Sequence, residues 1–291
     1  MLFRSLPGDP RWEYDDLARL REYVESYGLR LEALENTPKH FYEGAMLGTA
    51  DRDRQIEHYQ ATIRNVGRAG IPILGYHWMP NSVWRSQGTP LQIGRGGARV
   101  TAFDMKLHED SPNTHGRVYT ADEMWENYVH FIKAVIPAAE DAGIKLALHP
   151  DDPPLPAIRG QPRLVYQPSL YQKVIDLNPS PANALEFCVG SLAEMTEGDI
   201  YETVDNYSRQ QRLGYVHLRN VRGKVPHYRE TFIDDGDVDV LRVLAILHRN
   251  HFRGVIIPDH TPQMSCAAPW HAGMAYALGY LQAGLQSLKV P

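Results

Sequence analysis

The stretch KLALHPDDPP, residues 145–154, runs from a short apolar segment directly into histidine, aspartate and proline. Its first half has the length and composition of a parallel strand that is covered on both faces. Its second half has the composition of a loop. Gly143 stands just before it, at the end of the amphipathic pattern 121–142, as expected for a helix terminus. Helix, glycine, strand and polar loop together form one unit of an α/β fold.

The same unit recurs along the chain. Apolar runs that we expect to be strands occupy residues 29–34, 71–76, 144–148, 184–188, 215–218 and 255–258. Helical patterns cover residues 14–27, 52–69, 121–142, 169–177, 199–211 and 238–249, and a last helix is expected near 273–288. Strands that alternate with helices indicate a parallel sheet of right-handed βαβ units.

Polar residues at the ends of several different strands favour a TIM barrel over a doubly wound sheet. Six strands are two fewer than a closed (β/α)8 barrel needs, so we expect a barrel truncated at its N-terminus to about six βα units. The peptide Leu2-Phe3-Arg4-Ser5 is also the translation of CTC TTC CGA TCT, a common sequencing-adapter stretch. Residues 1–6 are therefore expected not to be native.

No linker or change of composition divides the chain, so residues 1–291 are interpreted as a single domain. Within it, residues 77–119 form a long excursion after a strand. Loops of this length usually serve as lids or binding loops, and we expect a lid-like insertion.

Composition excludes several kinds of partner. The 291 residues include 30 basic and 35 acidic ones, a net charge of -5, whereas nucleic-acid-binding proteins usually carry a basic face. No stretch approaches the roughly 18 uncharged apolar residues of a membrane span. Cys188 and Cys266 do not make a disulfide framework, which predicts a reducing cytoplasm. We expect a small-molecule substrate, no nucleic acid and no membrane, with a homo-oligomer left open.

Four predicted strand ends carry side chains that can bind a metal: His149, Cys188, His217 and Asp259. Each follows or ends an apolar strand, so all four are expected to point toward one axis at the barrel mouth. Two imidazoles, a thiolate and a carboxylate suit a divalent transition ion. Any one of them alone is more often a satisfied core residue, but four at successive strand ends indicate a metal site.

Polar neighbours of these positions are candidates for substrate binding and catalysis. Asp151 and Asp152 are expected to orient a ligand or bind substrate, unless one is only a solvated turn residue. Arg219, followed by Asn220, presents a planar fork for a substrate carboxylate, with a loop ion pair as an equal alternative. His260 directly follows the last predicted ligand and is expected to transfer a proton.

A second long loop follows the fifth predicted strand. His227 and Tyr228 lie in it, before the segment FIDDGDVDV. They could reach the barrel mouth, but a solvated loop is the favoured interpretation.

Five segments, in this order and spacing, resemble the mannonate dehydratase family: LALHPDDPP (146–154), FCVGS (187–191), YVHLRNV (215–221), GDVDV (236–240) and PDHTPQM (258–264). The insertion segment ARVTAFD (98–104) is similar as well. The resemblance covers the chain from about residue 7 to its end. It implies a metal-dependent, xylose-isomerase-like barrel that dehydrates D-mannonate to 2-keto-3-deoxygluconate in hexuronate (glucuronate) breakdown.

Position by position, the metal ligands that the resemblance implies are His149, Cys188, His217 and Asp259. It implies His260 as the acid/base residue and Tyr276 as a further catalytic candidate. The implied metal is Mn²⁺, although a thiolate ligand would also suit Fe²⁺ or Zn²⁺. Thr261 departs from the family, which usually has glycine there.

The implied reaction removes a weakly acidic C2 proton and expels the C3 hydroxyl as water. A divalent ion on the substrate carboxylate and C2 hydroxyl would stabilise the charge, Arg219 could hold the same charge, and His260 could protonate the leaving hydroxyl. Either His260 or a tyrosine could take the C2 proton. One alternative is a sugar isomerase or epimerase on the same barrel, which Cys188 disfavours because those sites usually hold metal with Glu and Asp. Another is a non-catalytic truncated barrel.

Overall fold

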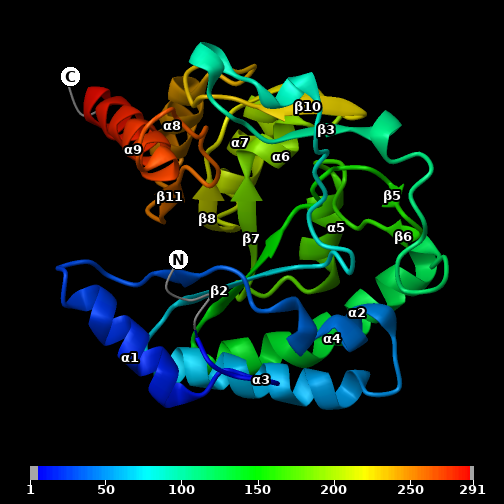
Figure 1. Ribbon diagram of the computed structural model, residues 1–291. Helices are drawn as coiled ribbons and strands as arrows, with labels where there is room; N and C mark the ends of the chain where they lie inside the picture. Colours follow the sequence, from blue (N-terminus) through cyan, green and yellow to red (C-terminus); the bar gives the residue numbers. More distant parts are fainter. Residues whose placement is uncertain (1–5, 289–291) are drawn as a thin grey trace.

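Six parallel strands form the central sheet of the computed structural model (Figure 1). In order across the sheet they are β1 (Ala33–Leu34), β2 (Ile73–His77), β4 (Lys145–His149), β7 (Asn183–Cys188), β8 (Leu213–His217) and β11 (Ile256–Ile257). Chain order equals spatial order, as in a barrel. The structure describes residues 6–288, so the expectation about residues 1–6 falls outside it apart from Leu6.

All six predicted strands are present, and the two outer ones are shorter than predicted. β1 and β11 each have two residues, where the sequence predicted 29–34 and 255–258. Each pairs with a neighbour on one side only in the six-stranded sheet, so fewer hydrogen bonds hold its ends.

All seven predicted helices are present. α1 (Tyr14–Glu25), α3 (Arg52–Arg68) and α4 (Ala121–Ala142) lie toward β1 and β2, and α7 (Ile200–Arg209), α8 (Val240–Arg249) and α9 (Pro269–Ser287) lie toward β8 and β11 (Figure 1). The remaining helices are α5 (Leu170–Leu177) and two short ones that the sequence did not predict, α2 (Glu43–Leu47) and α6 (Val189–Ala193). Within residues 6–288 the structure contains no helix whose length and apolar character would let it cross a membrane.

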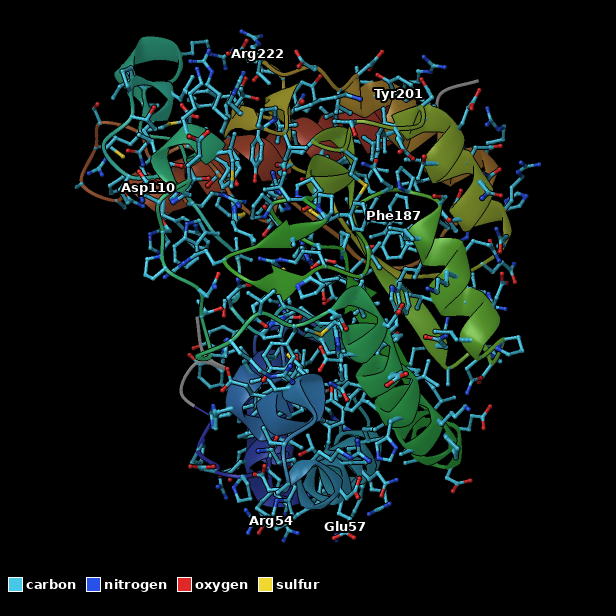
Figure 2. The ribbon with its side chains drawn as sticks, turned by 90° about the vertical axis from the view of Figure 1, so that its right-hand side faces the viewer. Arg54, Glu57, Asp110, Phe187, Tyr201 and Arg222 are labelled. Carbon is cyan, nitrogen blue, oxygen red and sulfur yellow. The ribbon has the colours of Figure 1, made fainter. Side chains whose placement is uncertain are left out.

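Side chains along each strand alternate between the helix layer and the inside of the curved sheet. On β7, Phe187 faces the helices, where its ring centroid lies 6.0 Å from that of Tyr171 and 6.2 Å from that of Tyr207 (Figure 2). Its neighbours Glu186 and Cys188 therefore face the inside, toward the other strands. The inward face carries the candidate site.

The interior beneath the strand ends leaves no room for a side chain on β2 at position 75. A Cβ on Gly75 would lie 2.2 Å from Tyr215 Oη and 2.8 Å from Glu186 Oε2. We expect Gly75→Ala to lower the free energy of unfolding by about 1–3 kcal/mol, measured by urea denaturation, because the extra methyl overpacks the core.

Two further variants test this explanation. Tyr215→Phe removes the closest atom, so the cost of Gly75→Ala should be smaller in that background. Gly279 in α9 has nothing within 4 Å of an added Cβ, so Gly279→Ala should cause no loss. An equal cost of Gly75→Ala with and without the Tyr215 hydroxyl would contradict the packing explanation.

A second, antiparallel sheet joins the insertion to the segment after β8. Its order is β3 (Ala102–Asp104), β10 (His227–Glu230) and β9 (Val221–Lys224) (Figure 1). The expectation of a solvated loop is wrong for Tyr228, which is buried with its ring 5.7 Å from that of Phe103. His227 is exposed as expected, but it lies in a strand and not in a loop. The partner strand lies more than a hundred residues earlier, so local sequence could not indicate it.

Short elements complete the described part of the chain. A two-stranded hairpin, β5 (Ala157–Ile158) and β6 (Gln161–Pro162), follows β4, and 3-10 turns lie at Lys39–Phe41, Pro90–Gln92, Arg95–Gly97 and Met105–Leu107. The insertion is also tied to the segment after β11, because the backbones of Arg99 and Gln263 exchange hydrogen bonds of 3.1 and 2.8 Å.

Candidate active site

Strand register brings three predicted ligands to one level of the sheet. Cys188 pairs with His217 across β7 and β8, and His149 pairs with His77 across β4 and β2. One ligand atom each of His149, Cys188 and His217 lies within 4.8 Å of the other two. All three residues are buried.

Asp259 and a residue that the sequence reasoning missed, Glu35, form a second group around His217. Their ligand atoms also lie within 4.8 Å of one another. Asp259 Oδ2 is 3.6 Å from His217 Nδ1, and Glu35 Oε2 is 2.8 Å from His217 Nε2. The other three predicted ligands thus lie near the His217 imidazole. Glu35 directly follows a predicted strand, the same signal that selected His149.

The donor set fits a divalent transition metal. His217 Nδ1 is buried and has no hydrogen-bond partner among residues 6–288, which is expected for a nitrogen that ligates a metal. Burial opposes ionisation of the Cys188 thiol, but Arg219 and His149 outweigh burial and hold its pKa well below the usual range. A thiolate beside two imidazoles and a carboxylate matches the ligand preferences of such ions.

The buried Glu186 and the half-buried His77 lie close to these ligands. Neither carboxyl oxygen of Glu186 has a hydrogen-bond partner, and Oε1 lies 3.3 Å from His217 Nε2. Burial, and then the charge of Glu35, raises the pKa of Glu186 to about 8. His77 accepts the backbone N–H of Met79 at 3.2 Å, and burial lowers its pKa to about 3. Both were missed, although an acidic residue inside the apolar run 184–188 is a usable signal.

Arg219 is buried, and its donors are taken by the protein. They bond at 2.6–3.1 Å to Glu194, Asp152, Ser191 and Asp259. These bonds fit the ion-pair alternative, because acceptors from three other segments surround the guanidinium. The contact with a substrate carboxylate stays a prediction. The arrangement makes Arg219 a residue that positions Asp259.

Asp152 connects the barrel to the insertion. Arg85 donates to both of its oxygens at 2.5 and 2.6 Å, and Tyr228 Oη donates at 2.8 Å. Asp152 is buried, and its carboxylate is surrounded by these donors and by Arg219. These contacts tie together segments that lie far apart in the chain, and they suit the predicted role of orienting a ligand. The predicted contact of Asp152 with substrate stays a prediction.

Asp151 and Asn220, also predicted to bind substrate, are bonded to backbone. Asp151 accepts the N–H groups of residues 164 and 165 at 2.8 and 2.6 Å, and Arg163 donates to it at 3.3 Å. The Asn220 amide donates to two backbone carbonyls at 2.9 and 2.8 Å. Both side chains are buried, so they fix loops at the site.

His260 is accessible, with its side chain 44% exposed. Its Nδ1 lies 2.8 Å from Glu230 Oε1, and its Nε2 lies 3.4 Å from Asp259 Oδ1. The Glu230 carboxylate raises the pKa of His260 to about 9. An accessible imidazole oriented by a buried carboxylate can transfer a proton to a bound molecule. Glu230 was missed because it lies in β10, which the sequence did not predict.

Tyr276 lies on α9 and is 39% exposed. Its hydroxyl is 3.4 Å from Arg95 Nη2, and its ring packs edge-on against Phe232. It shares a small cavity with Arg219 and His260. Tyr276 is therefore close to the candidate acid/base residue.

A pocket of about 300 Å³ opens beside His260. The insertion forms one wall and the segment after β11 the other. Its further lining includes Gln87, Gln92, Arg99, Gln263 and Trp270. Amide groups, a guanidinium and an aromatic face suit a polyhydroxylated carboxylic acid.

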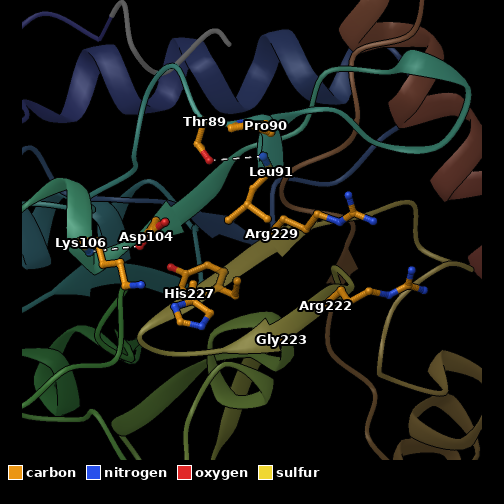
Figure 3. Close-up of a pocket in the computed structure, with 10 residues that line it drawn as sticks. Thr89, Pro90, Leu91, Asp104, Lys106, Arg222, Gly223, His227 and Arg229 are labelled. Carbon is orange, nitrogen blue, oxygen red and sulfur yellow. Dashed lines mark hydrogen bonds between the residues drawn. The ribbon is translucent and has the colours of Figure 1, made fainter.

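Another pocket, of about 600 Å³, lies at the second sheet (Figure 3). Lys106, Arg222, His227 and Arg229 are among the residues that line it. It contains none of the predicted metal ligands and does not include His260, so it is separate from the candidate active site.

Comparisons with known proteins agree with this arrangement. Residues 2–121 and 111–286 match the family model of D-mannonate dehydratase (UxuA). Mannonate dehydratase of Streptococcus equi subsp. zooepidemicus is 30% identical over 281 residues, 88% of this chain and 76% of that protein. Mannonate dehydratase of Streptococcus pneumoniae is 31% identical over 281 residues, which again are 88% of this chain and 76% of that protein.

Solved structures give the same result for the fold. The crystal structure of mannonate dehydratase from Streptococcus suis serotype 2 has a TM-score of 0.83 and 29% identity, and the match covers 99% of this chain and 86% of that one. A xylose isomerase domain protein from Planctomyces limnophilus shares the fold, with a TM-score of 0.61 and 12% identity. That match covers 97% of this chain and 86% of the other. The predicted xylose-isomerase-like barrel fold and dehydratase class are confirmed, and the chain belongs to the D-mannonate dehydratase (UxuA) family.

Proposed function

We propose that this chain is a hydro-lyase that converts D-mannonate to 2-keto-3-deoxygluconate and water, using a divalent metal, Mn²⁺. The residues that would hold the metal are His149, Cys188, His217 and Asp259. The observation that carries the proposal is that these residues, at or just after the ends of four parallel strands, form two compact groups that share His217, in a chain of this family. When bound, the metal supplies Lewis-acid polarisation of the substrate carboxylate and C2 hydroxyl.

The protein's own residues handle the protons. The C3 hydroxyl must leave as water, and it needs a proton from the enzyme. His260 is accessible, is oriented by Glu230 and lines the pocket beside the site, which supports it as that donor. The C2 proton goes either to His260 or to Tyr276, and both residues line one small cavity.

The substrate is proposed to lie in the pocket beside His260. Arg99 makes no ion pair within residues 6–288, so its charge is available for the substrate carboxylate. Residues 77–119 form one wall of this pocket, which supports their role as a lid. We treat residues 1–291 as one working domain.

The family also supports a place for the reaction in glucuronate breakdown in the cytoplasm. A homo-oligomer is favoured by α9, which has no charged residue and exposes Trp270, Leu278 and Leu285. Light scattering of the purified protein measures its mass in solution and so tests this last point.

The test of the function is a 2-keto acid assay. The purified chain is stripped with a chelator, reloaded with Mn²⁺ and offered D-mannonate beside epimeric aldonates. We expect keto acid from D-mannonate only after reloading. Binding of Mn²⁺ without this product would point to another sugar substrate, as an isomerase or epimerase would have.

Metal binding should also stabilise the fold. With free Mn²⁺ at 100 times its Kd, we expect about 2.7 kcal/mol of added stability, which raises Tm by roughly 5 °C. His149→Ala should lose this rise, whereas His248→Ala, an exposed residue of α8, should keep it. An equal rise in the His149 variant, measured by calorimetry, would exclude His149 as a ligand.

A further inference from the structure

The two ring nitrogens of His217 have different surroundings. Nε2 lies 2.8 Å from Glu35 Oε2 and 3.3 Å from Glu186 Oε1. Nδ1 has no hydrogen-bond partner, and Asp259 Oδ2 lies 3.6 Å from it. The imidazole is buried, so bulk water does not hydrogen-bond to either nitrogen.

A neutral imidazole carries its hydrogen on one nitrogen and a free lone pair on the other. A carboxylate accepts hydrogen bonds only, so the nitrogen beside Glu35 is the one that carries hydrogen. We propose that Glu35 is a positioning residue, whose carboxylate accepts the Nε2–H of His217 and thereby makes Nδ1 the atom offered to the metal. The inference rests on the proposed function and assigns a role to a residue outside the four ligands.

The competing role for Glu35 is that of a fifth ligand, since Glu35, His217 and Asp259 also form a compact group. A metal on Nε2 would replace the hydrogen that Glu35 accepts. It would leave Nδ1 buried without a partner, which is unfavourable for a polar group away from water. The hydrogen bond at Nε2 together with the unpartnered Nδ1 therefore favours positioning.

Glu35 is well placed to hold an orientation. It follows the end of β1, and two residues later the Thr37 N–H donates to the Gly75 carbonyl of β2 at 3.0 Å. The Thr37 hydroxyl lies 3.1 Å from Tyr59 Oη, in the buried core. These contacts fix the backbone that carries Glu35. Glu186, at 3.3 Å and without a hydrogen bond, contributes less to the orientation of the ring.

The experiment is a titration of the chelated protein with Mn²⁺, in which free Mn²⁺ is measured by electron paramagnetic resonance. Glu35→Ala removes the acceptor and should weaken binding about 10–100-fold. Glu35→Gln keeps an acceptor oxygen and should bind within about threefold of wild type. Glu32→Gln is the matched control, because Glu32 lies three residues earlier and pairs with the exposed Arg30; it should bind as wild type does.

Cobalt-loaded protein distinguishes positioning from ligation. The absorption bands of Co²⁺ report its ligands, so Glu35→Gln should leave them unchanged. Changed bands, or a Glu35→Gln variant that binds as weakly as Glu35→Ala, would make Glu35 a ligand and overturn the inference. Unchanged Mn²⁺ affinity in Glu35→Ala would also overturn it, while the proposed function would stand. A wild type that binds no Mn²⁺ would overturn both. Melting of the metal-free variants confirms that each is folded.

Discussion

Replacing His260 by alanine is expected to lower kcat for D-mannonate dehydration about 10²–10⁴-fold, the usual contribution of a general acid or base. The side chain lines the pocket and is held by the buried Glu230, so nothing else occupies its position. The protein should still fold, because the imidazole is half exposed. Steady-state kinetics with the Mn²⁺-loaded enzyme measures the loss.

A matched control separates this loss from general damage. His227→Ala changes an exposed histidine of β10, and its kcat should equal that of wild type. The His260 variant should also bind Mn²⁺ within a few-fold of wild type, since His260 is not among the proposed ligands. A kcat for the His260 variant within tenfold of wild type would remove His260 from the chemistry.

Arg219→Met is expected to lower the free energy of unfolding by about 3–5 kcal/mol, because it leaves buried carboxylates without their counter-charge. Glu194, Asp152 and Asp259 all accept hydrogen bonds from this guanidinium. Arg219→Lys keeps the charge but cannot reach all three, so it should lose part of the stability. Urea denaturation of the metal-free proteins measures both losses.

The control for Arg219 lies three residues along the chain. Arg222 is half exposed and pairs with Asp235 at 3.1 Å on the surface (Figure 2). Exposed pairs contribute about 0–1 kcal/mol, so Arg222→Met should cost little. If the Arg219 and Arg222 variants lost equal stability, the buried ion network would not be what holds the site together.

The central sheet was predictable because its four inner strands are almost entirely buried and all six strands stand out in the sequence as apolar runs. The four metal-ligand candidates were predictable for the same reason, since each ends such a run. The second sheet was not, because Tyr228 and Glu230 owe their burial to β3, which lies over a hundred residues earlier.

The sequence predicted which polar residues lie near the metal ligands better than it predicted what those residues do there. Arg219 and Asp152 do lie at the site, but each is bonded to buried partners that come from other segments. Local sequence shows that a guanidinium follows a strand and does not show whether its donors are taken. Glu35 and Glu186 carried signals in the sequence, one at a strand end and one inside an apolar run.

The pairing of β3 with β10 has a consequence for synthesis of the chain. Phe103 leaves the ribosome about 125 residues before Tyr228, its partner across the two strands. At 5–20 residues per second, translation takes roughly 6–25 s to deliver that partner. During this interval Phe103 lacks the cover that Tyr228 provides and has only partners such as His108 nearby. Slow translation or early release should therefore favour aggregation through residues 102–104.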